Sequence, residues 1–326
     1  MSTEVSATDD SVSDVSAVAQ SRRNRHRSSL SGAARFRRWW VPYLWMAAPV
    51  AVVITFYLYP FFNTFRLSLT DARPLTGMGD FVGFSNFSTL LGDDRFWNAA
   101  LNSVVYALIV VPCLTFLPLL LAVLVRKNVP GIGLFRSLYY LPAVSSLVVI
   151  ALAWRGILAS NGPINNILVN SGLLSESIPF LTGRWWLLIS ATLITIWAGL
   201  PYYMIMYLAA LVNVDKSLYE AAEMDGAGAV AQFFYVTIPG VRLMMALVAT
   251  LTTIGSLKIF TEVHLLGGGS GGIANRSETL TMFIRRIGID DPTYGSLGMG
   301  SAAAVFLFLM TLGFVILQQI LNRKEA

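Results

Sequence analysis

The sequence predicts an all-α polytopic membrane protein with six transmembrane helices. Hydrophobic residues make up 55% of the 326 residues, whereas charged residues make up only 13%. The mean hydropathy is +0.64, which is far too apolar for a soluble domain of this length. Because backbone polar groups must be satisfied internally in lipid, we expect the apolar runs to cross the membrane as helices.

The first region, residues 1–38, differs in composition from the rest of the chain. It begins with Ser, Val, Ala, Asp and Thr without helical periodicity and ends with seven arginines between Arg22 and Arg38. We expect a disordered cytoplasmic tail whose arginines set the topology or contact anionic lipid. No short apolar segment with a small-residue cleavage site is visible, so the first span should stay attached as an anchor.

The second region, residues 39–326, is the predicted transmembrane domain. About 20 apolar residues are needed to cross the hydrocarbon. Six runs meet this length, at 41–61, 102–125, 134–158, 185–211, 241–265 and 301–321. Prolines inside the runs should kink several of these helices, and they are Pro49, Pro112, Pro118, Pro142 and Pro201.

Charge placement predicts that both termini are cytoplasmic. If the tail lies inside the cell, Lys and Arg are more frequent in the inner segments than in the outer ones, which agrees with the positive-inside rule. Cys113 is the only cysteine, and His26 and His264 are the only histidines. These residues offer neither a disulfide nor a metal-ligand cluster.

A polar elbow at about 212–240 separates the fourth and fifth runs and should lie in the cytoplasm. Ser217 and Glu220 have the spacing of a capping box at the start of a helix. Gly226 can adopt the left-handed conformation that ends a helix, and Pro239 marks the entry to the next span. The elbow is therefore predicted to be a helix–turn–helix at the membrane surface.

The elbow resembles the signature of the permease subunits of binding-protein-dependent ATP-binding-cassette importers. That signature is E-A-A, three residues, G, nine residues and I-x-L-P. Here its positions are Glu220, Ala221, Ala222, Gly226, Val236, Ile238 and Pro239. Similar stretches cover about residues 42–322, among them the glycines Gly267–Gly269 of a loop typical of the maltose-permease-like subunit of sugar importers. Ser270 stands where that subunit usually has proline.

The resemblance implies a bacterial cell membrane protein that is not itself an enzyme. It implies a second permease, two copies of an ATPase, an extracytoplasmic substrate-binding protein and a sugar substrate; no nucleic-acid partner is expected. The chain has no G-x-x-x-x-G-K-[ST] loop, so ATP and Mg²⁺ should bind to the partner ATPase, and this chain should need no cofactor. The expected ATPase contacts are Glu220, Ala221, Ala222, Asp225, Gly226 and Pro239.

Polar and aromatic residues within the spans are candidates for the substrate pathway, because a sugar presents hydroxyls at its edges and C–H groups on its faces. The candidates are Asn102, Tyr106, Trp197, Tyr203, Lys258 and Glu262. Helix packing is the alternative role for the aromatic and amide side chains. Lys258 and Glu262 are four residues apart, so they either form an ion pair or line the pathway.

Two other functional classes fit the sequence less well. A stand-alone secondary transporter would need midplane acidic residues or inverted repeats, and the spans show neither. A membrane-embedded enzyme would need a cluster of nucleophile, base or metal ligands, which the sequence does not offer. Within the importer class, glycerol phosphate or another small polar solute is the alternative to a sugar.

Overall fold

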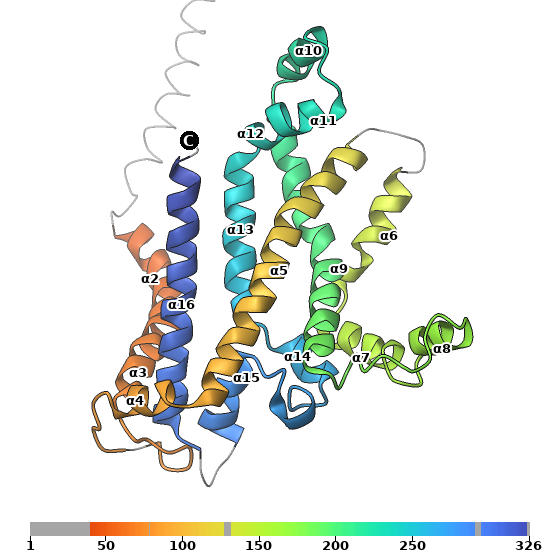
Figure 1. Ribbon diagram of the computed structural model, residues 1–326. Helices are drawn as coiled ribbons and strands as arrows, with labels where there is room; N and C mark the ends of the chain where they lie inside the picture. Colours follow the sequence, from red (N-terminus) through yellow and green to blue (C-terminus); the bar gives the residue numbers. More distant parts are fainter. Residues whose placement is uncertain (1–39, 78, 127–131, 291–294, 325–326) are drawn as a thin grey trace, which may run out of the picture. The chain divides into compact units, whose positions relative to one another are not determined.

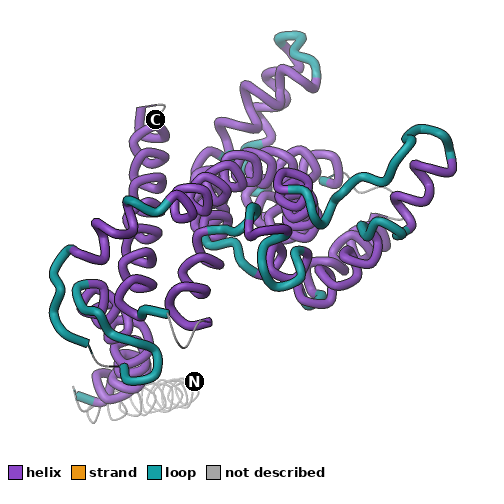
Figure 2. The backbone as a smooth tube through the Cα atoms, turned by 60° about the horizontal axis from the view of Figure 1, so that its bottom comes forward, coloured by secondary structure: helices purple, strands orange, loops and turns teal. Residues whose placement is uncertain are grey.

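A computed structural model describes residues 40–77, 79–126, 132–290 and 295–324. The predicted tail at 1–38 lies outside these residues. The chain forms two compact units, one that ends at Asn63 and one that begins at Thr64. Figure 2 shows helices joined by loops, and across the described residues the only β pairing is an isolated bridge between Thr70 and Phe81.

The first predicted span forms a helical run, Val41–Ser68, which is long and apolar enough to cross a membrane. It consists of α2 (Val41–Val53), a π-helical turn η1 (Ile54–Leu58) and α3 (Tyr59–Ser68). The wide turn ends two residues before Pro60, which lacks the backbone donor of a regular helix.

The second unit consists of helices and short connections. Its elements are α4 (Ser85–Leu91), α5 (Asp94–Val125), α6 (Ile132–Val144), α7 (Leu147–Ile157), α8 (Pro163–Asn170), α9 (Arg184–Leu211), α10 (Lys216–Met224), α11 (Ala229–Gln232), η2 (Phe233–Thr237), α12 (Ile238–Gly240), α13 (Arg242–Leu257), α14 (Thr261–Leu266), η3 (Ile273–Asn275), α15 (Leu280–Arg285), η4 (Arg286–Asp290) and α16 (Leu297–Lys324).

Helix α5 is the central element of this unit, because its residues enter all three buried apolar clusters. Phe96 packs with α15 and α16, Leu114 packs with α7, α9 and α14, and Leu119 packs with α9 and α13. Helices α5, α9 and α13 are accordingly side by side in Figure 1, with α10 to α12 at one end and α14 and α15 at the other. In the second unit, the long helices α5, α9 and α13 thus separate the short helices α10 to α12 from α14 and α15.

The third span differs from the prediction of one helix over 134–158. Helices α6 and α7 are bent by 102° at Ser145–Ser146. Pro142 weakens the preceding turn, and the Ser145 hydroxyl donates to the Leu141 carbonyl at 2.8 Å. Proline and paired serines are the usual causes of such kinks. Each half is shorter than the hydrocarbon is thick. Among the described residues, five helices are therefore long enough to span alone, and a sixth span requires both halves.

The fifth span also breaks where the sequence predicts a continuous helix. Helix α13 ends at Leu257, and Phe260 has a non-helical backbone before α14 begins. Of the two alternatives for Lys258 and Glu262, the ion pair is not formed, because the helical spacing that would align the two side chains is interrupted. No ion pair joins Lys258 to Glu262 in the described part of the chain.

The sequence also missed several short elements. Residues 85–91, which lie before the predicted start of the second span, form α4, and α8 and α15 were not predicted. Helix α5 begins two turns before the predicted start at residue 102, because Asp93 caps it by accepting from the Arg95 amide at 2.8 Å. Polar first turns of this kind are invisible to a search for apolar runs.

Candidate functional site

The elbow, residues 212–240, has the predicted helix–turn–helix form. Helix α10 ends in a Schellman motif in which Gly226 donates to the Glu223 carbonyl at 3.0 Å and Ala227 donates to the Ala222 carbonyl at 2.8 Å. Gly226 has φ +79°, which confirms its predicted left-handed conformation. Glycine adopts this conformation without the strain that a side chain would bring.

The predicted capping box is wrong, because the cap lies two residues earlier. Asp215 is the N-cap, and its carboxylate accepts from the Ser217 amide at 2.9 Å. These hydrogen bonds to Ser217 lower the pKa of the Asp215 carboxyl. Ser217 therefore lies inside the helix. Glu220 does not take part in the cap, which was the alternative role that the sequence suggested for it.

The base of the elbow is fixed to the ends of the spans. The Tyr219 and Thr237 hydroxyls are 3.0 Å apart and join the two arms of the elbow. The Arg126 guanidinium lies 5.2 Å from the centre of the Tyr219 ring. Gly240 is packed so closely that an added Cβ would be 3.0 Å from the methyl groups of Val214. The elbow therefore cannot swing freely on the bundle.

The outer surface of the elbow is exposed, although it carries large apolar side chains. Met224 is 89% exposed and Tyr235 is 82% exposed. The predicted contact residues Glu220, Ala221, Asp225, Gly226 and Pro239 are exposed as well, and Ala222 is half-buried. Within the described residues, Glu220 has no ion-pair partner. Exposed apolar groups mixed with unpaired charge on a rigid projection are typical of a protein–protein contact.

Three of the pathway candidates are buried in hydrogen-bond networks. Asn102 is fully buried and donates to the backbone carbonyls of Arg276 at 2.9 Å and Glu278 at 2.7 Å. The Arg184 guanidinium donates to the Asn102 carbonyl oxygen at 3.0 Å. Asn102 therefore joins the starts of α5 and α9 to the 271–279 loop, and its surroundings fit the packing alternative.

Tyr106 and Glu262 belong to a second buried network, which Thr195 completes. The Tyr106 hydroxyl donates to Thr195 Oγ1 at 2.5 Å, and Thr195 donates to Glu262 Oε1 at 3.0 Å. The chain of hydrogen bonds links α5, α9 and α14. Sequence reasoning missed Thr195 because a single threonine within an apolar span carries no pattern.

The remaining pathway candidates stay accessible. Trp197 is 40% exposed and packs edge-on against Trp154 with ring centres 5.7 Å apart. Tyr203 is half-buried against Tyr202, and Lys258 is exposed. Lys258 lines an open, mainly apolar cavity of about 510 Å³ between α13 and α16. The structure thus brings Tyr106 and Glu262 together and leaves Trp197, Tyr203 and Lys258 on separate surfaces.

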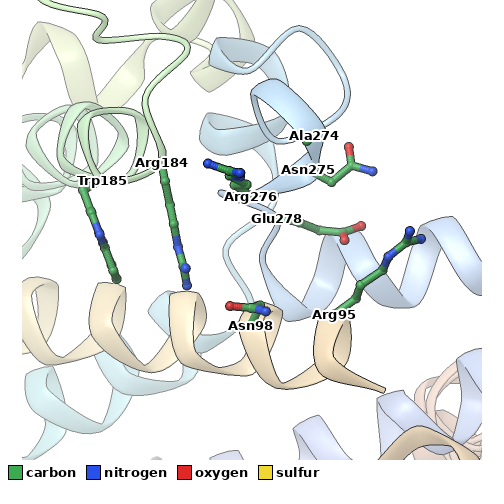
Figure 3. Close-up of a pocket in the computed structure, with 8 residues that line it drawn as sticks. All are labelled: Arg95, Asn98, Arg184, Trp185, Ala274, Asn275, Arg276 and Glu278. Atoms are coloured by element: carbon green, nitrogen blue, oxygen red, sulfur yellow. The ribbon is translucent and has the colours of Figure 1, made fainter. Parts of the chain in front are cut away.

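A further cluster, not predicted as a site, lies where α5 and α9 begin. Arg95 and Asn98 of α5, Arg184 and Trp185 of α9, and residues 274–276 and 278 surround a cavity of about 640 Å³ (Figure 3). In the sequence these arginines only contributed to the charge balance. Their positions 95, 184 and 276 are too far apart to form a recognisable motif.

Comparison with known proteins gives one family and a consistent set of relatives. The profile of the family described as "Binding-protein-dependent transport system inner membrane component" matches residues 85–326. The lactose transport system permease protein LacF of Rhizobium radiobacter is 35% identical, with 79% of this chain and 85% of that protein covered. The arabinooligosaccharides transport system permease protein AraP of Halalkalibacterium halodurans is 31% identical, with 85% of each protein covered.

The fold also matches a solved transporter. A chain from the crystal structure of a bacterial transporter for import of the acidic polysaccharide alginate superposes with a TM-score of 0.75 at 23% identity. The match covers 88% of the present chain and 96% of that chain. The all-helical membrane fold predicted from the sequence is thereby confirmed.

Proposed function

The chain belongs to the family of binding-protein-dependent transport system inner membrane components, and we propose that it forms half of the translocation pathway of an ATP-driven carbohydrate importer. It is a multi-pass inner membrane protein whose relatives are permease subunits. In the proposed assembly the chain pairs with a second permease and two ATPase subunits. An extracytoplasmic binding protein delivers the sugar, and both termini of this chain face the cytoplasm.

The elbow is the observation that carries this proposal. Its base is fixed by Tyr219 and Thr237, whereas its outer surface is exposed and includes an unpaired Glu220. A rigid projection can transmit a push from a partner into the spans that it joins, α9 and α13. Closure of the two ATPase subunits on ATP would move the elbow and rock the spans between inward-open and outward-open forms.

Glu220 is the proposed charged contact to the ATPase, since helix capping by Asp215 leaves its carboxylate free for that role. Ala221 and Ala222 offer short side chains beside it, and Gly226 and Asp225 shape the turn. ATP and Mg²⁺ would bind to the ATPase subunits and not to this chain.

A carbohydrate is the proposed substrate because the two relatives described above are named as permeases for lactose and for arabinooligosaccharides. The accessible side chains Trp197, Tyr203 and Lys258 are the proposed pathway contacts. Asn102, Tyr106 and Glu262 are buried and would support the pathway by positioning α5, α9 and the 271–279 loop. A binding assay with the purified extracytoplasmic protein would decide between a sugar and another small polar solute such as glycerol phosphate.

Site-directed cross-linking tests the proposed coupling. Cys113 is the only cysteine of the chain, so a Cys113→Ser background allows one new cysteine to be placed at a time. We expect Met224→Cys, at the tip of the elbow, to cross-link to an ATPase subunit in native membranes. The matched control is Ile273→Cys, an exposed apolar position in η3, within the 271–279 loop that follows α14, and it should give no such product.

Two outcomes would contradict the proposal. A membrane-impermeant thiol reagent that labels Met224→Cys from outside intact cells would place the elbow on the wrong side. Purification of the tagged chain without an ATPase and a second permease would favour a stand-alone carrier.

A further inference from the structure

A cavity of about 510 Å³ lies between α13 and α16, which run side by side (Figure 1). Most of its lining is apolar, with Ile254, Leu307 and Val315 among the lining residues. Phe308 and Leu312 also line it and are 39% and 42% exposed, so the cavity opens onto the surface of the second unit. A sugar needs hydrogen-bond partners for its hydroxyls, and such a lining suits an apolar occupant better.

Three polar side chains interrupt this apolar lining. The Thr311 hydroxyl is satisfied, because it donates to the Leu307 carbonyl at 2.7 Å. The Thr281 hydroxyl is buried and has no hydrogen-bond partner among the described residues. Lys258 is exposed, and within the same residues its ammonium group forms no ion pair. A charged group within a membrane span is costly unless an opposite charge accompanies it, so Lys258 points to an anionic group at one end of the occupant.

Lys258 lies on a different face of α13 from the residues that pack into the bundle. Thr252 and Ser256 are buried, and α13 contacts α5. Ile254 and Lys258 are four residues apart, so they share a face of the helix. That face borders α16 and the cavity. The ammonium group is therefore available to an occupant that enters from outside the bundle.

The cavity has the depth and length of one membrane leaflet. Helix α13 has 16 residues and is about 24 Å long, whereas the hydrocarbon is about 30 Å thick. In the proposed orientation, Lys258 therefore lies about one turn inside the outer edge, and its long side chain can reach the headgroups. Along α16 the lining extends from Ala304 to Val315, which is about 16 Å. This length is close to half the hydrocarbon thickness.

We propose that this cavity binds one phospholipid of the outer leaflet. An acyl chain lies between α13 and α16, the Lys258 ammonium group pairs with the phosphate, and the Thr281 hydroxyl donates to a further oxygen of the head. Lipids with a net negative charge bind best, because a zwitterionic head carries its own cation. The lipid connects α13, α15 and α16 beside the break in the fifth span. This role is an alternative to the sugar contact proposed for Lys258.

Native mass spectrometry tests the anionic end of the site. The full-length chain is purified with the subunits that accompany it, stripped of lipid, and titrated with phosphatidylglycerol or with phosphatidylcholine. We expect Lys258→Met to weaken the binding of one phosphatidylglycerol molecule about tenfold, because a hydrogen bond to a charged group contributes about one such factor. Phosphatidylcholine should bind more weakly and depend less on Lys258. The matched control is Lys216→Met, an exposed lysine of α10 outside the cavity, which should bind like the unmodified chain.

A second pair of variants tests the apolar part of the site. Ala304→Phe places a ring in the cavity and should weaken the same binding step. Leu309→Phe adds the same ring at an exposed position of α16 that does not line the cavity, and it should leave binding unchanged. Glycerol phosphate has the charged head without the acyl chain, so it should not displace the lipid.

Three outcomes would overturn the inference. The first is equal phosphatidylglycerol binding by the unmodified chain, Lys258→Met and Ala304→Phe. The second is a cross-link from Lys258→Cys, in the Cys113→Ser background, to a second permease, because a protein would then cover the cavity. The third is a changed KM for sugar uptake in Lys258→Met with unchanged lipid binding, which would assign Lys258 to the pathway. The lipid titrations need neither sugar nor ATP, so this inference and the proposed function can fail separately.

Discussion

Replacing Asn102 with leucine should loosen the junction between α5, α9 and the 271–279 loop. The change keeps the approximate size of the side chain but removes two hydrogen bonds to backbone carbonyls and the acceptor for Arg184. Because Asn102 is fully buried, water cannot replace these partners at the site. The carbonyl groups of Arg276 and Glu278 then lose a donor within the protein interior.

The expected loss of stability follows from these three interactions. Hydrogen bonds in membrane proteins average about 0.6 kcal/mol each, which sets a lower bound of about 2 kcal/mol for three. Values from soluble proteins, about 1 kcal/mol for each neutral bond and about 1.5–3 kcal/mol for a bond to a charged group, give about 3.5–5 kcal/mol. We therefore expect the Asn102→Leu variant to lose about 2–5 kcal/mol.

Thermal unfolding of the purified complex, followed by fluorescence-detected size exclusion, measures this loss. Hydrogen exchange should rise selectively in residues 271–280. The control is Asn166→Leu, which removes one exposed hydrogen bond to the Asn161 carbonyl and should change stability by less than about 0.5 kcal/mol. Equal stability and equal hydrogen exchange in the two variants would refute the role of Asn102 in joining α5, α9 and the 271–279 loop. If the Asn102→Leu variant instead has a changed KM for uptake and unchanged stability, Asn102 is a substrate contact.

Three further outcomes are expected from the elbow and from α16. Gly226→Asp should leave the protein in the membrane but abolish uptake. The control Gly228→Ala, at a residue with an ordinary φ of −68°, should transport normally. Normal uptake by Gly226→Asp would refute the proposal that the elbow transmits motion from the ATPase. Gly298→Ala should destabilise the chain by about 1–3 kcal/mol or more in thermal unfolding, because its Cβ would collide with the Thr70 carbonyl. Gly313→Ala on the same helix has open space and should be tolerated, so equal melting of the two variants would contradict the close approach. Asp215→Ala should speed amide exchange in α10 at neutral pH, whereas Asp215→Asn should preserve the cap.

The pH dependence of that cap has a definite sign. The folded-state pKa of Asp215 is lowered by its hydrogen bonds to Ser217. Its contribution to helix stability is therefore complete above the ordinary carboxyl pKa of about 3.9 and is lost as pH falls through the lower folded-state value. The protection that Asp215 gives α10 should therefore stay constant between neutral pH and about pH 5. Protection that disappears near neutral pH would contradict the assignment of Asp215 as the cap.

Local patterns were sufficient to predict the spans and the elbow. Apolar runs located the spans because burial in lipid selects hydrophobic side chains over a fixed length. Gly226 was predictable as the end of α10, since a left-handed residue after a run of helix formers needs glycine. The cap was assigned to the wrong residue because Asp215 and Ser217 are both good N-caps, and the backbone direction at residue 215 decides between them.

Other features depended on contacts between distant parts of the chain. The sequence showed Asn102, Tyr106 and Glu262 as polar residues in apolar runs, but it could not distinguish a pathway lining from a buried tie. Their partners Arg184, Thr195 and Glu278 come from other helices and loops. The bend after Val144 and the break at Lys258 likewise interrupt runs that are continuously apolar.

The sequence by itself determined that this is a helical membrane permease with a polar elbow between its fourth and fifth spans. That information is local, because hydrophobic length and helix-ending residues act within one segment. Tertiary structure decided which polar side chains are buried, where the third and fifth spans break, and that Arg95, Arg184 and Arg276 line one cavity. These properties arise from packing between segments, for which a single sequence carries no periodic signal.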